Sequence, residues 1–525
     1  MPKQLHNFIQ ISANHQPDKI ALNHKKEHLD YQTLWSELEK TSQLLLEQGI
    51  ASGERIAIYL PKRFETVVAF FAASNAGAVF VPINPLLKPE QVAYILKDCN
   101  VRILITSHDR LNQLGDALSE CHDLFLAIDI NNKAEVHSDK HYRVCHWNTS
   151  ESDKKLAPHR RIDADIASIL YTSGSTGKPK GVVLSHSNMI VGAKSVAEYL
   201  ENHANDNLLA VLPFSFDYGL SQLTTAFHAG ASATLLDYLL PRDVVKAIEK
   251  FGITGLAGVP PLWNQLAQLD WSKINTDSLR YITNSGGAMP KASLANLRNA
   301  LPKAKVYLMY GLTEAFRSTY LPPEEIDKRP DSMGKAIPNA EVMVVREDGS
   351  PCAPGEPGEL VHRGSLVSLG YWNDANKTAE HFKPVPDKNN GLTLTEIAVW
   401  SGDKVKMDEE GYLYFVARKD DMIKTSGYRV SPTEIEEVIY ATGLVSETAA
   451  LGLSHPTLGQ AIAIIATSAN GGDKDKLLIE CKKQLPNFMV PAYIEYVDSM
   501  PKNPNGKIDR KQLALTYANL FQESI

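Results

Sequence analysis

The chain has 525 residues, 43% of them hydrophobic and 22% charged, a composition that argues against disorder and allows about two to four domain-sized cores. Its 54 basic and 61 acidic residues give a net charge of −7 without a dense basic block, which argues against nucleic-acid binding through bulk charge. No stretch approaches the roughly 18 consecutive apolar residues of a membrane span, and the first residues do not read as a secretion signal, so we expect a cytoplasmic protein without a membrane span.

Helical and strand patterns alternate through the N-terminal half of the chain. The expected elements before residue 107 are helices at 34–46, 66–76 and 89–97 and strands at 55–60, 78–83 and 101–106. Further along we expect strands at 166–170, 208–213, 232–236, 255–258 and 281–284 and helices at 220–228 and 242–251. This alternation predicts βαβ units in mainly parallel sheets, and its length predicts two stacked αβ layers.

A loop rich in hydroxyl groups and glycine follows the strand expected at 166–170. Its glycines allow backbone N–H groups to converge on an anion, and its lysines add positive charge. Pro179 follows Lys178 where a Walker A loop has a magnesium-binding Ser or Thr, which argues against a kinase or GTPase loop. The pattern predicts a polyphosphate-binding loop, and the alternative is an ordinary Gly/Ser surface turn.

The pattern changes near Asp331. Residues 341–403 are richer in glycine and proline and carry short alternating strands such as 359–362, which predicts a β-rich subdomain at about 331–418. Residues 419–525 have a pattern of their own, with a helix start at 431–440 and strands at 445–453 and 461–466. We therefore expect an α/β fold with an N-terminal domain at 1–418, of two stacked αβ layers plus the β-rich subdomain, and a small α+β C-terminal domain at 419–525.

Four further motifs follow the loop in chain order. They are Tyr-Gly-Leu-Thr-Glu-Ala at 310–315, Trp-Ser-Gly-Asp at 400–403, Ala-Arg-Lys-Asp-Asp-Met-Ile-Lys-Thr-Ser-Gly-Tyr-Arg at 417–429 and Pro-Lys-Asn-Pro-Asn-Gly-Lys-Ile at 501–508. With the loop at 171–186 they resemble the signature motifs of the AMP-forming adenylating enzymes, which include acyl-CoA synthetases, peptide-synthetase adenylation domains and firefly luciferase. The resemblance covers nearly the whole chain, which looks most like bacterial stand-alone acyl-CoA ligases of the exosortase-associated kind.

The resemblance implies a ligase with ATP and Mg²⁺ as cofactors. Such an enzyme converts a small carboxylic acid and ATP into acyl-AMP and pyrophosphate, and then passes the acyl group to the thiol of CoA or of phosphopantetheine on a carrier protein acting in trans. The alternatives are a stand-alone amino-acid adenylation enzyme that loads a separate carrier protein, a luciferase-like oxidoreductase, and an inactive scaffold that retains nucleotide binding. The complete set of candidate residues argues against the scaffold.

The resemblance also assigns a nucleotide site. Glu314 would bind Mg²⁺, Thr313 would donate its hydroxyl to the α-phosphate, and Asp403 would accept hydrogen bonds from the ribose hydroxyls. From the residues alone, Glu314 could instead be a solvated carboxylate and Asp403 part of a Gly-Asp turn. The other expected ATP-binding residues are Thr172, Ser173, Gly174, Ser175, Thr176, Gly177, Lys178 and Lys180 at the phosphates, Gly286, Gly287 and Ala288 along the adenine, Tyr310 stacked on the ring, its neighbour Gly311, and Arg418 at the ribose or phosphate.

Lys507 is the sharpest catalytic prediction. In the enzymes that this chain resembles, a lysine after a glycine near the C-terminus bridges the carboxylate of the acid and the α-phosphate, and it stabilises the charge that develops during adenylation. The resemblance further implies that the C-terminal domain is mobile. It would swing about a hinge at Asp420 and then present Lys424 and Gly427 along a tunnel for the thiol.

Phe216, Asp217, Ser285 and Ala315 are the expected acid-binding residues. Many acyl-CoA synthetases have a histidine after an aromatic residue in this stretch, whereas this chain has Phe-Asp, like peptide-synthetase adenylation domains whose aspartate holds the substrate ammonium. A carboxylate in a mostly apolar pocket is costly unless a cation pairs with it. We therefore hypothesise an acid that bears an amino group, with Asp217 as its counter-ion. Equally, Asp217 could cap the helix expected to begin near Gly219 or pair with Arg317.

Overall fold

The computed structural model of the chain describes residues 2–134, 141–147, 155–172, 179–386, 393–418, 422–425, 428–455, 458–468, 471–485 and 487–521. Within these residues the first sheet has the strand order β7-β6-β5-β3-β4-β8-β9 and is parallel except for β9. Its strands are β3 (Arg55–Tyr59), β4 (Val79–Pro82), β5 (Val101–Thr106), β6 (Leu126–Asp129), β7 (Arg143–His146), β8 (Ile166–Thr172) and β9 (Lys180–Ser185).

The second sheet has the order β16-β15-β14-β13-β12-β10-β11-β1-β2, with a parallel centre and antiparallel edges. Its strands are β1 (Ile20–His24), β2 (Glu27–Asp30), β10 (Asn207–Ala210), β11 (Ser232–Leu235), β12 (Gly255–Gly258), β13 (Tyr281–Asn284), β14 (Lys305–Tyr310), β15 (Thr319–Leu321) and β16 (Lys335–Ala336). The predicted stacked αβ layers are thus confirmed, because most of the strands alternate with helices and pair in parallel.

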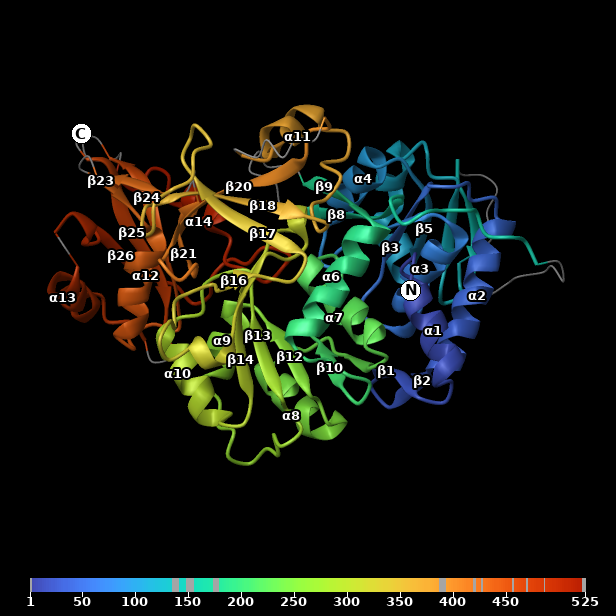
Figure 1. Ribbon diagram of the computed structural model, residues 1–525, viewed down its shortest axis with the longest axis horizontal. Helices are drawn as coiled ribbons and strands as arrows, with labels where there is room; N and C mark the ends of the chain where they lie inside the picture. Colours follow the sequence, from blue (N-terminus) through green and yellow to red (C-terminus); the bar gives the residue numbers. More distant parts are fainter. Residues whose placement is uncertain are drawn as a thin grey trace.

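Helices cover both sheets, and one apolar core joins them. Figure 1 shows α6 and α7 between the two sheets, and core side chains of both sheets belong to one cluster with those of α3, α6 and α7. The helices of this region are α1 (Asn7–His15), α2 (Tyr31–Glu47), α3 (Phe64–Ala76), α4 (Pro89–Asp98), α5 (His108–Leu114), α6 (His186–Tyr199), α7 (Asp217–His228), α8 (Pro241–Phe251), α9 (Pro260–Leu266) and α10 (Lys291–Ala300), with short 3-10 turns η1 (Gly115–Glu120), η2 (Thr313–Ala315) and η3 (Pro323–Glu325).

The helix ends follow local chemistry that the sequence carries. Asp30 precedes α2, and its side chain accepts a hydrogen bond from the Thr33 N–H, so it caps the helix. Gly77 ends α3 in the left-handed conformation with φ +83°, which a residue with a side chain would adopt at a cost. Several helices begin at a proline, whose missing N–H is unneeded in the first turn.

A third, antiparallel sheet forms the β-rich region, as predicted. Its order is β17-β18-β20-β19, and β21 pairs with β20. The elements are β17 (Ala340–Val345), β18 (Gly358–Gly364), α11 (Ala375–His381), β19 (Phe382–Pro384), β20 (Ile397–Met407) and β21 (Leu413–Arg418).

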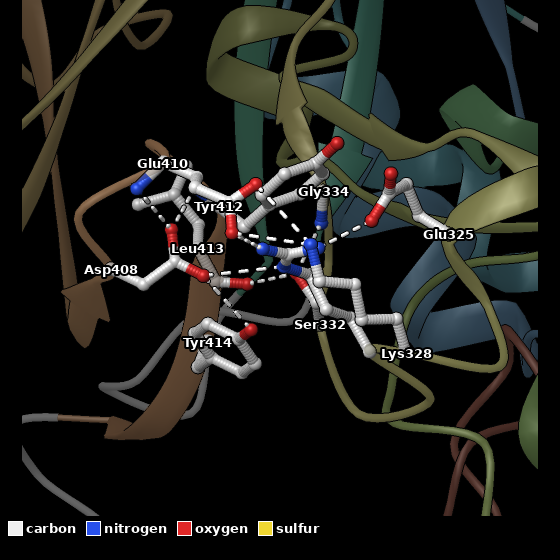
Figure 2. Close-up of polar contacts among 10 residues, drawn as sticks. Glu325, Lys328, Ser332, Gly334, Asp408, Glu410, Tyr412, Leu413 and Tyr414 are labelled. Carbon is white, nitrogen blue, oxygen red and sulfur yellow. Dashed lines mark hydrogen bonds and ion pairs between the residues drawn. The ribbon is translucent and has the colours of Figure 1, made fainter.

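Buried Arg329 joins this third sheet to the segment that follows η3. Its guanidinium makes ion pairs with Glu325, Asp408 and Glu410, and its Cζ lies 4.1 Å from the centre of the Tyr412 ring (Figure 2). An arginine fork that contacts carboxylates on both segments fixes their relative position. The β-rich region is therefore held firmly against the larger layers.

The C-terminal residues form a fourth sheet, of order β23-β22-β25-β24, with β26 paired to β25. Its strands are β22 (Ile423–Thr425), β23 (Tyr428–Val430), β24 (Glu447–His455), β25 (Gly459–Thr467) and β26 (Tyr493–Tyr496), accompanied by α12 (Pro432–Ala441), α13 (Lys474–Gln484), η4 (Asn487–Met489) and α14 (Arg510–Thr516). Figure 1 shows this smaller unit beside α10 and the third sheet. Among the helices that the structure describes, none is both long and apolar enough to cross a membrane.

Candidate functional site

The predicted phosphate loop connects two strands that pair with each other. Thr172 at the end of β8 pairs with Lys180 at the start of β9, and the two strands are antiparallel. A Walker A loop instead leads from a strand into a helix, so this hairpin has a different architecture. The remaining residues predicted for the loop, Ser173, Gly174, Ser175, Thr176, Gly177 and Lys178, lie outside the described residues.

Tyr310 and Asp403 lie together although they are far apart in sequence. The Tyr310 Oη donates a hydrogen bond to the Asp403 Oδ2 over 2.5 Å, and the Asp403 side chain is buried. β20 continues past Asp403 to Met407 and pairs Asp403 with Arg418 of β21. Gly402 takes φ +74° where the register of β20 shifts, so the Gly-Asp pair forms an irregularity within the strand rather than a turn.

The segment after β13 approaches the C-terminal lysine. Ser285 is buried, whereas Gly287 and Ala288 are exposed. Gly286 has φ +80°, and a Cβ added to it would lie 2.7 Å from the Lys507 Cε and 2.9 Å from its Nζ. Only glycine fits here without displacing the lysine, because of both the space and the backbone conformation.

Lys507 lies on a tight turn formed by residues 503–507. The Asn503 Oδ1 accepts a hydrogen bond from the Lys507 N–H at 3.1 Å, the Asn503 N–H donates to the Lys507 carbonyl at 2.8 Å, and Gly506 has φ +78°. The Asn84 side-chain amide donates to the carbonyl of Pro504 at 2.6 Å. This last contact docks the turn on the loop that follows β4, so the lysine is delivered into the larger domain.

The Lys507 ammonium also lies over an acid-site residue. Its Nζ is 5.0 Å from the centre of the Phe216 ring, a cation–π distance. Phe216 precedes α7, whose first residue is Asp217. The structure therefore brings three predicted residues together. Phe216 precedes α7, Gly286 follows β13, and Lys507 belongs to the C-terminal unit.

Asp217 is a buried carboxylate with a neutral hydrogen-bond donor. The Thr313 Oγ1 donates to its Oδ1 at 3.4 Å. Burial raises its pKa above the usual value, although the nearby positive charges of Arg317 and Lys507 oppose that shift. Arg317 acts on Asp217 through its charge, and within the described residues its Nε and Nη2 make no hydrogen bond to that carboxylate. The helix α7 begins at Asp217 rather than near Gly219 and its N-cap is Phe216, so the capping role is wrong.

Replacing Asp217 with Asn should stabilise the protein at neutral pH in the absence of substrate. The pKa of Asp217 is raised in the fold, so its contribution to stability is complete below its unfolded-state pKa and is lost as pH rises through its folded-state pKa. Asn is uncharged throughout and keeps an oxygen that can accept from Thr313. Thermal melts should show a higher midpoint for Asp217→Asn at pH 8 and a difference that shrinks as pH falls. A lower midpoint at pH 8 would contradict the burial argument.

Glu314 is held by a residue that sequence reasoning missed. It lies in the 3-10 turn η2, and its Oε1 accepts a hydrogen bond from the Tyr371 Oη at 2.6 Å. The Lys180 Nζ is 5.7 Å from the centre of the same tyrosine ring. Mg²⁺ is usually bound by one or two carboxylates with substrate phosphates and water, so an oriented Glu314 next to the hairpin of the predicted phosphate loop fits this ion.

The structure describes only some of the remaining predicted residues. Ala315 is fully buried in η2, and Gly311 follows β14, where an added Cβ would lie 3.2 Å from the Arg317 Cα. Arg418 ends β21 and Lys424 lies in β22, but only the backbone of these two is described. The predicted hinge residue Asp420 and the tunnel residue Gly427 lie outside the described residues.

The chain matches two family models. One, described as AMP-binding enzyme, covers residues 9–372, more than half of the chain, and the other, described as AMP-binding enzyme C-terminal domain, covers residues 434–507. The matched ranges contain the two sides of the site described above. The Phe216 and Gly286 side belongs to the first, and the Lys507 turn belongs to the second.

Curated proteins and solved structures agree with these matches. A long-chain-fatty-acid–CoA ligase of Escherichia coli O157:H7 is 29% identical over 97% of this chain and 94% of its own length. Gramicidin S synthase 2 of Aneurinibacillus migulanus is 28% identical, over 95% of this chain but 11% of that protein. The crystal structure of the anthranilate CoA ligase AuaEII in complex with anthranoyl-AMP has a TM-score of 0.89 and 25% identity, with 99% of this chain and 98% of that chain covered. The chain therefore belongs to the AMP-binding enzyme family, as an adenylate-forming acid–thiol ligase.

Proposed function

We propose that this enzyme activates a carboxylic acid that carries an amino group and transfers it to CoA. The acid's carboxylate attacks the α-phosphorus of ATP, the bond to the β-phosphate breaks, and acyl-AMP and pyrophosphate result. The thiol of CoA then attacks the acyl carbon, the bond to AMP breaks, and a thioester and AMP result, with the thiol proton released. ATP and Mg²⁺ are the family's cofactors, and near full-length similarity to CoA ligases supports CoA over a carrier protein as the acceptor.

Lys507 acts as the catalytic cation in this proposal. Two anions must approach each other for adenylation, and a fixed positive charge between them lowers the barrier. The support is its position: the turn at 503–507 is docked through Asn84, and its Nζ reaches Phe216 and Gly286. In this proposal the arrangement is the adenylation position of a mobile C-terminal domain.

Other residues bind and orient the nucleotide. Asp403, positioned by Tyr310, would accept from the ribose hydroxyls with Arg418 on the neighbouring strand, and the adenine would lie along Gly286, Gly287 and Ala288. The hairpin loop from Thr172 to Lys180 would hold the β- and γ-phosphates. Glu314 would hold Mg²⁺, which when bound neutralises phosphate charge, and Tyr371 orients that carboxylate.

The amino-group proposal rests on one observation: the carboxylate of Asp217 is buried and accepts a hydrogen bond from a neutral side chain. Asp217 is 4% exposed, and the side chain that donates a hydrogen bond to its carboxylate is a neutral threonine hydroxyl at 3.4 Å. Burial of an ionised carboxylate is unfavourable unless a cation or several donors compensate. A substrate ammonium would pair with it, and an aryl amine would donate hydrogen bonds to it. AuaEII, whose name gives anthranilate as its acid, is an example of a similar enzyme acting on an amino-bearing acid.

The test is ATP–pyrophosphate exchange with acids that differ only in the amino group. Suitable pairs are anthranilate with benzoate and 2-aminohexanoate with hexanoate. The wild type should prefer one amino-bearing member, and Asp217→Ala should reduce that preference by about 10–100-fold, the value of a hydrogen bond to a charged group.

Asp18→Ala is the matched control, because Asp18 is an exposed aspartate of the same domain. It should keep the wild-type preference. Equal exchange with both members of every pair in the wild type, or an unchanged preference in Asp217→Ala, would refute the role of Asp217. Exchange followed by thioester formation with CoA or with a phosphopantetheinylated carrier then identifies the acceptor.

Several narrower expectations stay predictions. These are the exosortase-associated subgroup, the domain boundary at 418/419, the cytoplasmic location, the hinge at Asp420 and the tunnel residues Lys424 and Gly427. Stand-alone amino-acid adenylation for a separate carrier and luciferase-like oxidation are not favoured, because the CoA ligases match this chain over nearly their full length.

A further inference from the structure

A small cavity with both polar and apolar lining lies between α6, α7 and the second sheet. Its volume is about 10 Å³, and its lining includes Tyr218, Ser221 and Thr225 of α7 and Arg317, which follows η2. Asp217, Ser221 and Thr225 are spaced by four residues, so they share one face of α7. The cavity therefore lies beside the acid site along the same helix face, with Ser221 about 6 Å further along the helix axis than Asp217.

Arg317 is a buried cation with incomplete hydrogen bonding. It is 1% exposed, and its Cζ lies 4.7 Å from the centre of the Tyr218 ring. Within the described part of the chain, its Nε and Nη2 have no hydrogen-bond partner, and the hydroxyl oxygens of Ser221 and Thr225 also have none. Buried donors are nearly always satisfied, and an unpaired buried charge is especially unfavourable. These unsatisfied polar atoms around one cavity indicate a ligand group that belongs there.

The two unpaired nitrogens specify the chemistry of that group. Nε and Nη2 lie on one edge of the planar guanidinium and point the same way, which is the fork that binds both oxygens of a carboxylate. The Tyr218 ring covers the face of the guanidinium and leaves the edge available. The hydroxyl groups of Ser221 and Thr225 can each donate one further hydrogen bond.

We propose that Arg317, Ser221 and Thr225 form a subsite for a second carboxylate at the far end of the acid. The proposal rests on the proposed function, because it places the reacting carboxylate at Lys507 and the amino group at Asp217. Two cations and one carboxylate give the site a net positive charge, and an amino acid with two carboxylates carries the opposite net charge. The substrate class is thus a short amino dicarboxylic acid.

The cavity must widen to take a carboxylate, since a volume of about 10 Å³ holds at most one water molecule. Gln222 and Met309 also line it, and their long unbranched side chains can change rotamer without moving the backbone. The Gln222 amide donates to the carbonyl of Tyr218 in its own helix, a contact that is easily exchanged. We therefore expect movement of these two side chains to open the subsite.

The test compares acids that differ only in the charge of the far end. Glutamate with glutamine, aspartate with asparagine, and glutarate with its monoamide are matched in size, and kcat/KM for ATP–pyrophosphate exchange is measured for each. The wild type should prefer the carboxylate member of at least one pair by about 10–100-fold. Arg317→Met should bring that ratio close to one, and Arg317→Lys, which keeps the charge without the fork, should give an intermediate ratio.

Arg242→Met is the matched control, because Arg242 is an exposed arginine on α8. It should retain the wild-type ratio. A purely structural role for Arg317 would lower both members of a pair equally and leave the ratio unchanged, which would overturn the proposal. If Arg317→Met does not fold, Ser221→Ala with Thr225→Val should reduce the same ratio, and an unchanged ratio there would also overturn it.

The same measurements distinguish a failure of the subsite proposal from a failure of the proposed function. Wild-type exchange with amino-bearing monocarboxylic acids or with the amides, but no preference for a second carboxylate, would refute the subsite and keep the ligase. No acid-dependent exchange with any acid of either panel would refute the proposed function itself. A thermal shift of the wild type by glutarate, larger than that by its monoamide and absent in Arg317→Met, would support the subsite without any turnover.

Discussion

Replacing Lys507 with alanine is expected to slow acyl-adenylate formation by about 10²–10³-fold, the loss typical of removing one preorganised group that stabilises developing negative charge. The Lys507 ammonium lies over the Phe216 ring and against Gly286, near buried Asp217. A charge in a partly apolar pocket acts more strongly than the same charge in water. The measurement is acid-dependent ATP–pyrophosphate exchange at saturating ATP.

Two comparisons make this result specific. Lys511→Ala removes an exposed lysine on the same small domain, and it should leave exchange at the wild-type rate. Thioester formation started from supplied acyl-AMP and CoA should be slowed far less by Lys507→Ala than adenylation, because that step does not bring two anions together. Exchange at the wild-type rate in Lys507→Ala would remove the basis of the proposed mechanism.

Local pattern was sufficient to predict most of the framework. The strands expected at 101–106, 255–258 and 281–284 coincide with β5, β12 and β13, because each is a short segment with apolar residues at its centre that lies between helical patterns. The turn before Lys507 was equally predictable, since Asn503 and Gly506 each have a defined role in a tight turn.

Irregular backbone was harder to predict. The Gly402-Asp403 pair suggests a turn, yet the strand runs on through it, because neighbouring strands β18 and β21 supply hydrogen bonds on both sides of the irregularity. The start of α7 was predicted three residues late. Asp217 and Tyr218 belong to the helix and are buried at the candidate site, and helix propensity does not indicate such positions.

Contacts between distant residues could not be predicted from the sequence. Tyr371 holds Glu314 across 57 residues, and no spacing in the chain indicates the pair. Arg317 was considered as a partner for Asp217, and only the structure shows that its guanidinium stacks on Tyr218 with one edge unpaired among the described residues. These long-range arrangements determine which ligand groups the site can bind.

Replacing Glu314 with Gln should reduce adenylation by about 10²-fold and raise the Mg²⁺ concentration needed for the half-maximal rate, because an amide oxygen is a weaker ligand for a hard divalent ion than a carboxylate. Exchange rates across a Mg²⁺ titration measure both effects. Glu324→Gln, an exposed glutamate close in sequence, is the control and should leave the titration unchanged.

The Tyr371→Phe variant tests the orientation of the Glu314 carboxylate independently of its charge. The variant keeps the charge of Glu314 but removes the hydrogen bond to its Oε1, so the loss should stay within about tenfold, and added Mg²⁺ should restore most of it. Glu314→Gln, which lacks the carboxylate charge, should therefore be more impaired than Tyr371→Phe at every Mg²⁺ concentration. A Mg²⁺ titration of Glu314→Gln that superimposes on that of the wild type would show that the ion is held elsewhere, and Tyr371 would then have no reason to orient this carboxylate.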